Sequence, residues 1–199
     1  MYSRDTMPES SMAQTSYYHA TLCLQGALLV SKDEKGEGIK VAVGLGDKPF
    51  PLNLKRKLAA VLMEKPPEGE QSVIVWPRTD KEGLLGNGTQ LALYKNVGEL
   101  SREPGLHALG ELVKVDKENA LLQLQIHPNE KQGNLNKPFR LPLVASLELL
   151  EGLPELGSGL EVWGELKPRT GRLVVTRVQA VPLPPKRVVV STPTAGQAT

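Results

Sequence analysis

The sequence predicts a mainly β protein that contains two tandem copies of one unit of roughly 80–90 residues. Three observations point to this organisation. Short apolar segments recur in the same order in both halves of the chain. Apolar and polar residues alternate within some of these segments, which is typical of strands with one buried face. Clusters of glycine, proline and charged residues separate the segments, as turns do.

Three landmarks define the repeat: a glycine within an apolar run, the sequence KPFxLxL, and a tryptophan after a short apolar run. The spacings between the two copies are 84, 89 and 87 residues. Duplication followed by changes in loop length would leave such a near-constant spacing. The paired landmarks are Gly26 and Gly110, the KPFxLxL segments that begin at Lys48 and Lys137, and Trp76 and Trp163.

In the first copy we expect three strands, a short helix and two further strands. Residues 18–31 form a long apolar run, which the charged turn KDEKGEG separates from the next run. The helix has apolar residues at i, i+3 and i+4 from Leu58, and Pro66 and Pro67 end it. The expected elements are strands 18–31, 39–45 and 50–54, helix 55–64, a fourth strand that ends at Trp76, and strand 89–97.

The second copy has the same order of elements. Leu122, Leu124 and Ile126 alternate with glutamines, so one face of this strand is expected to be buried and the other polar. Gly152 and Pro154 end the second helix. The expected elements are strands 106–115, 120–127 and 139–143, helix 144–151, a fourth strand that ends at Trp163, and strand 172–181.

This order, with a glycine inside the first strand, resembles the OB-fold, a five-stranded Greek-key barrel. A glycine relieves crowding where such a strand bends sharply. The resemblance implies two tandem OB-like barrels, at residues 17–100 and 101–182, each with one short helix between strands three and four. An SH3-like or other small barrel is the alternative. A disordered N-terminal tail (1–16) and a flexible, Pro-rich and basic C-terminal tail (183–199) are expected to flank them.

Composition limits the classes of function. The formal net charge of +2 is close to neutral and does not predict a protein that binds polyanions over its whole surface. The single cysteine excludes an internal disulfide and is compatible with a cytoplasmic location. No apolar run approaches the ~20 residues that a membrane helix needs, so no membrane partner is expected.

No catalytic or metal-binding motif is evident. The three histidines, His19, His107 and His127, have no spacing typical of metal ligands. The glycine-rich segment GLLGNG lacks the pattern of a phosphate-binding loop. Serine, histidine and aspartate are too scattered to indicate a triad. We therefore expect a protein that is not an enzyme and has no cofactor or metal site.

The OB-fold resemblance implies a binding site on strands two and three, framed by the loops after strand one and before strand five. In the second copy the latter loop is residues 164–171. Between positions 164 and 187 there are six basic residues and one acidic residue, a cluster suited to phosphate contacts. The candidate cations are Lys167, Arg169, Arg172 and Arg177, with Arg140 on the third strand and Lys55, Arg56 and Lys57 at the first helix.

The two tryptophans have two interpretations. Trp76 and Trp163 could stack on bases beside the loops. Their equivalent positions in the two copies favour instead packing against the end of each barrel. The predicted function is binding of single-stranded DNA or RNA, mainly by the second copy. The alternative is a protein-interaction or assembly factor that uses the barrels as scaffolds, and a catalytic or small-molecule-binding domain is the third hypothesis.

Overall fold

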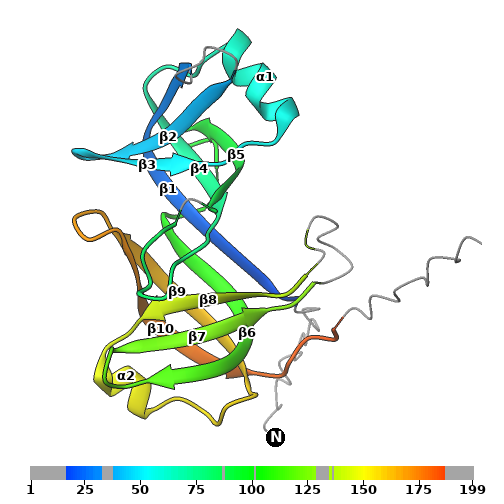
Figure 1. Cartoon of the computed structure of the whole chain (residues 1–199), viewed down its shortest axis with the longest axis vertical. Coiled ribbons are helices and arrows are strands. Elements are labelled where there is room, and N and C mark those ends of the chain that lie inside the picture. The colour runs from blue at the N-terminus through cyan, green and yellow to red at the C-terminus, as the bar shows by residue number, and fades with distance from the viewer. Residues whose placement is uncertain are drawn as a thin grey trace, which may run out of the picture.

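A computed structural model of the chain describes residues 17–32, 38–86, 88–100, 102–128, 135 and 137–186 (Figure 1). The described residues are mainly β, with ten strands in one mixed sheet and two short helices. No helix in these ranges is long and apolar enough to cross a membrane. The tail expected at residues 1–16 and residues 187–199 of the C-terminal tail lie outside the described residues.

The first half has five strands and one helix in the expected order. The helix is amphipathic: Leu62 is fully buried, and Leu58 packs on the core. Pro66 and Pro67 follow its C-terminal end, as the sequence predicts. The elements are β1 (His19–Lys32), β2 (Ile39–Leu45), β3 (Lys48–Leu52), α1 (Arg56–Glu64), β4 (Glu70–Trp76) and β5 (Gln90–Asn96).

The second half repeats this order, with two main differences from the expectation. The helix expected at 144–151 begins at Leu147, because Val144 ends the third strand. The fourth strand does not end at Trp163 but continues to Lys167, so the loop expected at 164–171 is shorter. Gly164 packs against the Val174 carbonyl of the next strand, and Leu166 is buried, so alternation continues past the tryptophan. The elements are β6 (Gly105–Asp116), β7 (Leu121–Ile126), β8 (Phe139–Val144), α2 (Leu147–Glu151), β9 (Gly159–Lys167) and β10 (Arg172–Val181).

The strands of the two halves pair in the same way. In the first half β1 pairs antiparallel with β2 and β4, β2 pairs with β3, and β4 pairs with β5. A parallel bridge between Asn53 and Gln90 joins the end of β3 to β5. In the second half β6 pairs with β7 and β9, β7 with β8, and β9 with β10, while Val144 of β8 pairs in parallel with Val174 of β10. In each half, the series of paired strands therefore leads from the first strand through the other four and back to the first.

The two strand glycines lie where the chain comes close to a neighbouring strand. A Cβ atom at Gly26 would collide with the Gly44 carbonyl oxygen of β2. A Cβ atom at Gly110 would lie 2.8 Å from the Cδ1 atom of Ile126 on β7. The crowding inferred from the sequence at these two positions is therefore present in the structure.

The halves are joined at two places. At the first, residues 19–23 of β1 pair antiparallel with residues 105–109 of β6, and Figure 1 shows β1 running from one half into the other. At the second, the loop between β4 and β5 reaches β10: the Leu85 N–H donates to the Gly171 carbonyl at 2.8 Å, and the Leu173 N–H donates to the Gly83 carbonyl at 3.0 Å. One cluster of buried apolar side chains extends through both halves.

The start of the expected C-terminal tail contacts the second half. Lys186 Nζ and His127 Nε2 each donate to Glu111 Oε2 at 2.7 Å. The hydrogen bond from Lys186 is the main reason why the pKa of Glu111 is lowered. Residues 183–186 are thus held near β6 by an ion pair.

Candidate functional site

The basic residues predicted at the end of the second half lie near the first half. The β9–β10 hairpin extends toward the β2–β3 hairpin (Figure 1). Lys48 Nζ donates to the main-chain carbonyl of Arg169, and Arg172 lies 4.0 Å from a carboxylate oxygen of Glu82. Lys167 forms an ion pair with Glu165. These carboxylates partly neutralise the cations that were expected to contact phosphates.

Arg140 is separate from that hairpin. It is exposed on β8, opposite Gln125 of β7. Part of this β7–β8 surface is covered by the loop between β4 and β5 of the first half. Thr79 Oγ1 donates to the Pro142 carbonyl at 2.8 Å, and the guanidinium carbon of Arg78 lies 3.5 Å from the centroid of the Phe139 ring. The surface on which the OB-fold resemblance placed the ligand is thus partly occupied by the chain itself.

Trp163 lies on the outer side of β9, with a neighbour on each face of its ring. His107 of β6 stacks on it, with centroids 5.3 Å apart and planes 18° apart. Arg177 of β10 places its guanidinium carbon 3.7 Å from the indole centroid. Both neighbours are direct cross-strand partners of Trp163, on opposite sides. Packing against the barrel end is therefore wrong for Trp163, and a base would have to displace a neighbour to stack on it.

The row of side chains continues from Trp163 across the joint between the halves. The rings of His107 and His19 have centroids 4.5 Å apart, and His19 is followed by Tyr17 at 5.4 Å. His107 Nε2 donates to Glu161 at 2.7 Å. Burial lowers the pKa of His19, although a hydrogen bond to the Tyr17 carbonyl acts in the opposite direction. Sequence spacing gave no sign of this cluster, because its members come from three strands.

The three cations at the first helix lie where a helix is least suited to positive charge. Lys55 is the N-cap residue, Arg56 is the first residue of α1, and Lys57 follows. No side chain caps the N–H groups, and the first turn contains no acidic residue. The helix dipole disfavours cations at this end, and unpaired N–H groups here suit an anion.

Beside this helix end the surface forms a cavity of about 300 Å³, which we call the Trp76 slot. It lies between α1, the end of β4, and β5. Its lining is largely apolar, and the Lys55 ammonium lies 4.9 Å from the centroid of the Trp76 ring. Trp76 therefore borders a surface cavity beside α1. The slot is lined mainly by Lys55, Lys57, Leu58, Val61, Trp76 and Leu91.

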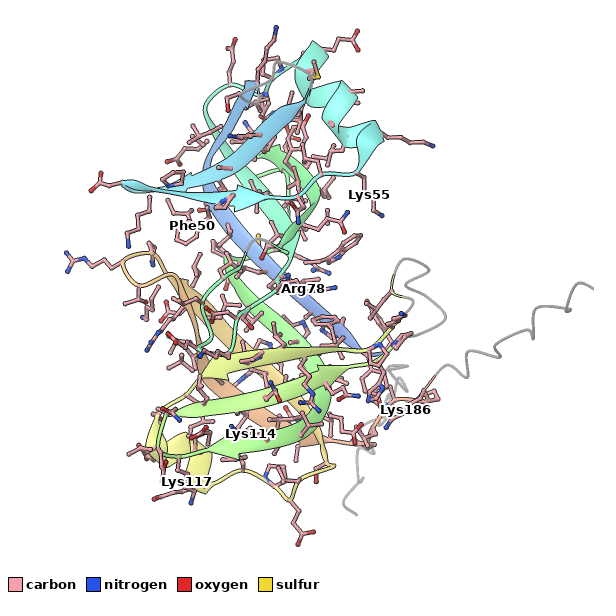
Figure 2. All side chains as sticks on the ribbon, viewed as in Figure 1. Phe50, Lys55, Arg78, Lys114, Lys117 and Lys186 are labelled. Atoms are coloured by element: carbon pink, nitrogen blue, oxygen red, sulfur yellow. The ribbon has the colours of Figure 1, made fainter. Side chains whose placement is uncertain are left out.

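The side chains labelled in Figure 2 show how these groups are distributed. Lys55 lies on one side of the first half and Phe50 on the opposite side, near the β9–β10 hairpin, whereas Arg78 lies between the two halves. The structure thus brings Lys55, Lys57 and Trp76 together. Arg140 and Trp163 lie on β8 and β9 of the second half.

Other chemistry is limited in the described part of the chain. No group of three or more His, Cys, Asp or Glu residues there is arranged to hold a metal ion. Cys23 is buried in β1, and burial raises the pKa of its thiol. A buried thiol with a raised pKa is a poor nucleophile.

Comparison with known proteins identifies no relative: no protein-family model matches the chain, and no curated protein matches it significantly.

Proposed function

We propose that the chain binds single-stranded nucleic acid without catalysing a reaction, and that the Trp76 slot of the first half is its main contact. The observation that carries this proposal is the slot itself, an apolar cavity walled by an indole with an ammonium 4.9 Å from the ring. Its volume is at the lower end of the range for ligand pockets, about 300–1,000 Å³. A single base is an appropriate occupant.

The strand pairing supports the fold on which this function depends. Each half pairs its strands in the order one, two, three, five, four and back to one. We propose that each half is an OB-like Greek-key barrel, a fold that commonly binds oligonucleotides. In this proposal the second half positions the first half and does not provide the main contact itself. The reason is that the β4–β5 loop partly covers the surface of β7 and β8, where the second half would bind a ligand.

The groups around the slot match the parts of a nucleotide. A base stacked on an aromatic side chain contributes about 1–3 kcal/mol. The ammonium groups of Lys55 and Lys57 and the uncapped N–H groups of α1 are suited to the phosphate. Cations at an uncapped helix start lower local stability, and such violations of local preference are expected at functional sites.

Fluorescence anisotropy with a labelled oligonucleotide of about 16 nucleotides tests the proposal, because that length spans the site of one barrel. We expect binding at low salt. Trp76→Ala should weaken it by about 5- to 150-fold, the equivalent of one stacked base. The double variant Lys55→Ala/Lys57→Ala should weaken it and reduce the salt slope by about 1.4, because two phosphate contacts are lost.

The double variant Lys167→Ala/Arg169→Ala is the matched control, because it removes the same charge from the second half. We expect it to bind nearly as well as the wild type. If this control loses more affinity than Lys55→Ala/Lys57→Ala, the main contact lies on the β9–β10 hairpin. If the wild type shows no binding at low salt, the chain does not bind single-stranded nucleic acid.

A protein partner is the second candidate, and exposed apolar side chains on α1 and β5 favour it. Val61 and Met63 of α1 are 51% and 57% exposed, and Leu93 of β5 is 41% exposed. A partner that docks here should be lost with Met63→Ser and retained after nuclease treatment. Oligonucleotide binding that persists unchanged in Met63→Ser would separate the two functions.

A further inference from the structure

Two imidazole rings face each other across the joint between the halves. His19 lies on β1 and His107 on β6, two adjacent antiparallel strands. The Nε2 atom of His19 and the Nδ1 atom of His107 are 3.2 Å apart. This contact is separate from the Trp76 slot, and the proposed function does not use it.

The other nitrogen of each ring is bonded to a group that only accepts hydrogen bonds. His19 Nδ1 donates to the Tyr17 carbonyl at 2.9 Å. His107 Nε2 donates to the Glu161 carboxylate at 2.7 Å. A neutral imidazole carries one proton, and these two bonds account for it in each ring. When both rings are neutral, the two facing nitrogens therefore both present lone pairs, which repel each other unless a proton or a metal cation lies between them.

We propose that His19 and His107 bind a divalent transition-metal ion of borderline softness, of the class of Zn²⁺ and Cu²⁺. Zinc–nitrogen distances are about 2.0–2.1 Å, so nitrogens 3.2 Å apart would subtend about 100° at the ion, close to the tetrahedral angle. Imidazole suits both ions, and Cu²⁺ is held more tightly than Zn²⁺ by a given set of ligands.

The surrounding hydrogen bonds support this assignment. Histidines that bind metals almost always donate their second ring N–H to a carboxylate or a backbone carbonyl. Glu161 and the Tyr17 carbonyl supply one of each. With only two protein ligands, the remaining positions would be taken by water. The side chain of His107 is 40% exposed, so water and ions can reach it. A bound ion would link β1 to β6 and so hold the halves together.

Trp163 provides a direct readout because its ring stacks on His107. The variant Trp76→Phe leaves Trp163 as the only indole of the chain. In this background, after treatment with a chelator, Cu²⁺ should quench the fluorescence saturably with one ion per chain. His19→Gln or His107→Gln should abolish the saturable phase. Glu161→Gln, which keeps both imidazoles, should weaken binding by about tenfold or more. His127→Gln is the control histidine variant and should bind as the parent does.

Thermal unfolding of the full chain gives a second readout. An ion that binds only the folded state raises the unfolding temperature. We expect Zn²⁺ to raise it for the wild type and not for His19→Gln/His107→Gln, with circular dichroism confirming that this variant is folded. If the double histidine variant does not fold, Glu161→Gln replaces it in the test. We then expect Zn²⁺ to raise the unfolding temperature of Glu161→Gln by less than it raises that of the wild type. The same Cu²⁺ quenching in parent and histidine variants, or no saturable binding by the parent, would overturn the proposal.

Discussion

Gly110 lies where β6 is too close to its neighbour β7 for a side chain. A Cβ atom there would lie 2.8 Å from Ile126 Cδ1, 3.0 Å from Leu124 Cβ and 3.1 Å from the Gln125 carbonyl oxygen. Because a side chain, a β-carbon and a backbone oxygen surround the position, no single rotation makes room. Single residues of this kind set how near two strands can come.

Gly110→Ala should therefore destabilise the protein by about 1–3 kcal/mol, the usual cost of overpacking a core. Urea unfolding monitored by circular dichroism measures this change. Gly152→Ala is the matched control, because a Cβ atom there comes no closer than 3.8 Å to the atoms around it. Equal unfolding free energies for Gly110→Ala and the wild type would show that β6 and β7 can separate without cost.

Asp116, at the β6–β7 turn, gives a prediction of pH dependence. Hydrogen bonds from Lys114 Nζ and from Asn119 lower its pKa from 3.8 to about 2. A depressed carboxyl pKa stabilises the folded state at pH values above the ordinary pKa, and this contribution is lost as the pH falls toward 2. Carboxyl carbon NMR should show Asp116 titrating near pH 2, and Lys114→Ala should raise that midpoint. A midpoint near 4 in the wild type contradicts the turn geometry.

At the scale of elements, the two helices begin in opposite ways. Ser146 caps α2 by accepting a hydrogen bond from the Leu149 N–H at 3.2 Å. Lys55 provides no cap for α1. The start of the helix is thus capped, and so stabilised, in the second half but not in the first.

Lys55→Ser should separate stability from binding. A serine at the N-cap should stabilise α1 by about 0.5–1 kcal/mol, whereas removal of the ammonium should weaken oligonucleotide binding. Urea unfolding and anisotropy on the same preparation check both expectations. A variant that becomes more stable and binds as tightly as the wild type would remove Lys55 from the proposed site.

Elements were predictable from the sequence to the extent that they depend on local patterns. Alternation located β7, and the repeated KPFxLxL segment located β3 and β8. The end of β9 is not predictable from the sequence, because Gly164 suggests a turn, although it pairs with Val175 of β10. Of the Trp76 slot, the sequence predicts Lys55, Lys57 and Trp76 as candidate site residues, but the distance between Lys55 and Trp76 depends on how α1 packs. The His19–His107 contact was missed because it depends on the pairing of β1 with β6, strands far apart in the chain.

At the scale of the whole molecule, the two halves form one connected sheet. β1 pairs with β2, β4 and β6, and the β4–β5 loop contacts β8 and β10. The repeat predicted two similar units and could not predict how they contact each other, because that contact depends on loops in which the copies differ. The joint also decides which of the predicted basic residues are exposed to a ligand.

The two halves should consequently unfold together. Each half contains one tryptophan, so Trp163→Phe reports on the first half and Trp76→Phe on the second. We expect the same urea midpoint from both reporters. Gly83→Val should separate the midpoints, because a side chain at Gly83 would press against Val144 and push the β4–β5 loop off β8. If Trp163→Phe and Trp76→Phe have different urea midpoints without the Gly83→Val substitution, the contacts between the halves do not couple their unfolding.

The pairing of β1 with β6 also has a consequence for the order in which the chain folds during synthesis. Residues 19–23 leave the ribosome long before residues 105–109, their partners in the sheet. Until β6 is made, this end of β1 is an unpaired edge, the kind of surface on which strands of different chains associate. A protein truncated after the first half would keep this edge permanently, and we expect it to aggregate where the full chain remains monodisperse.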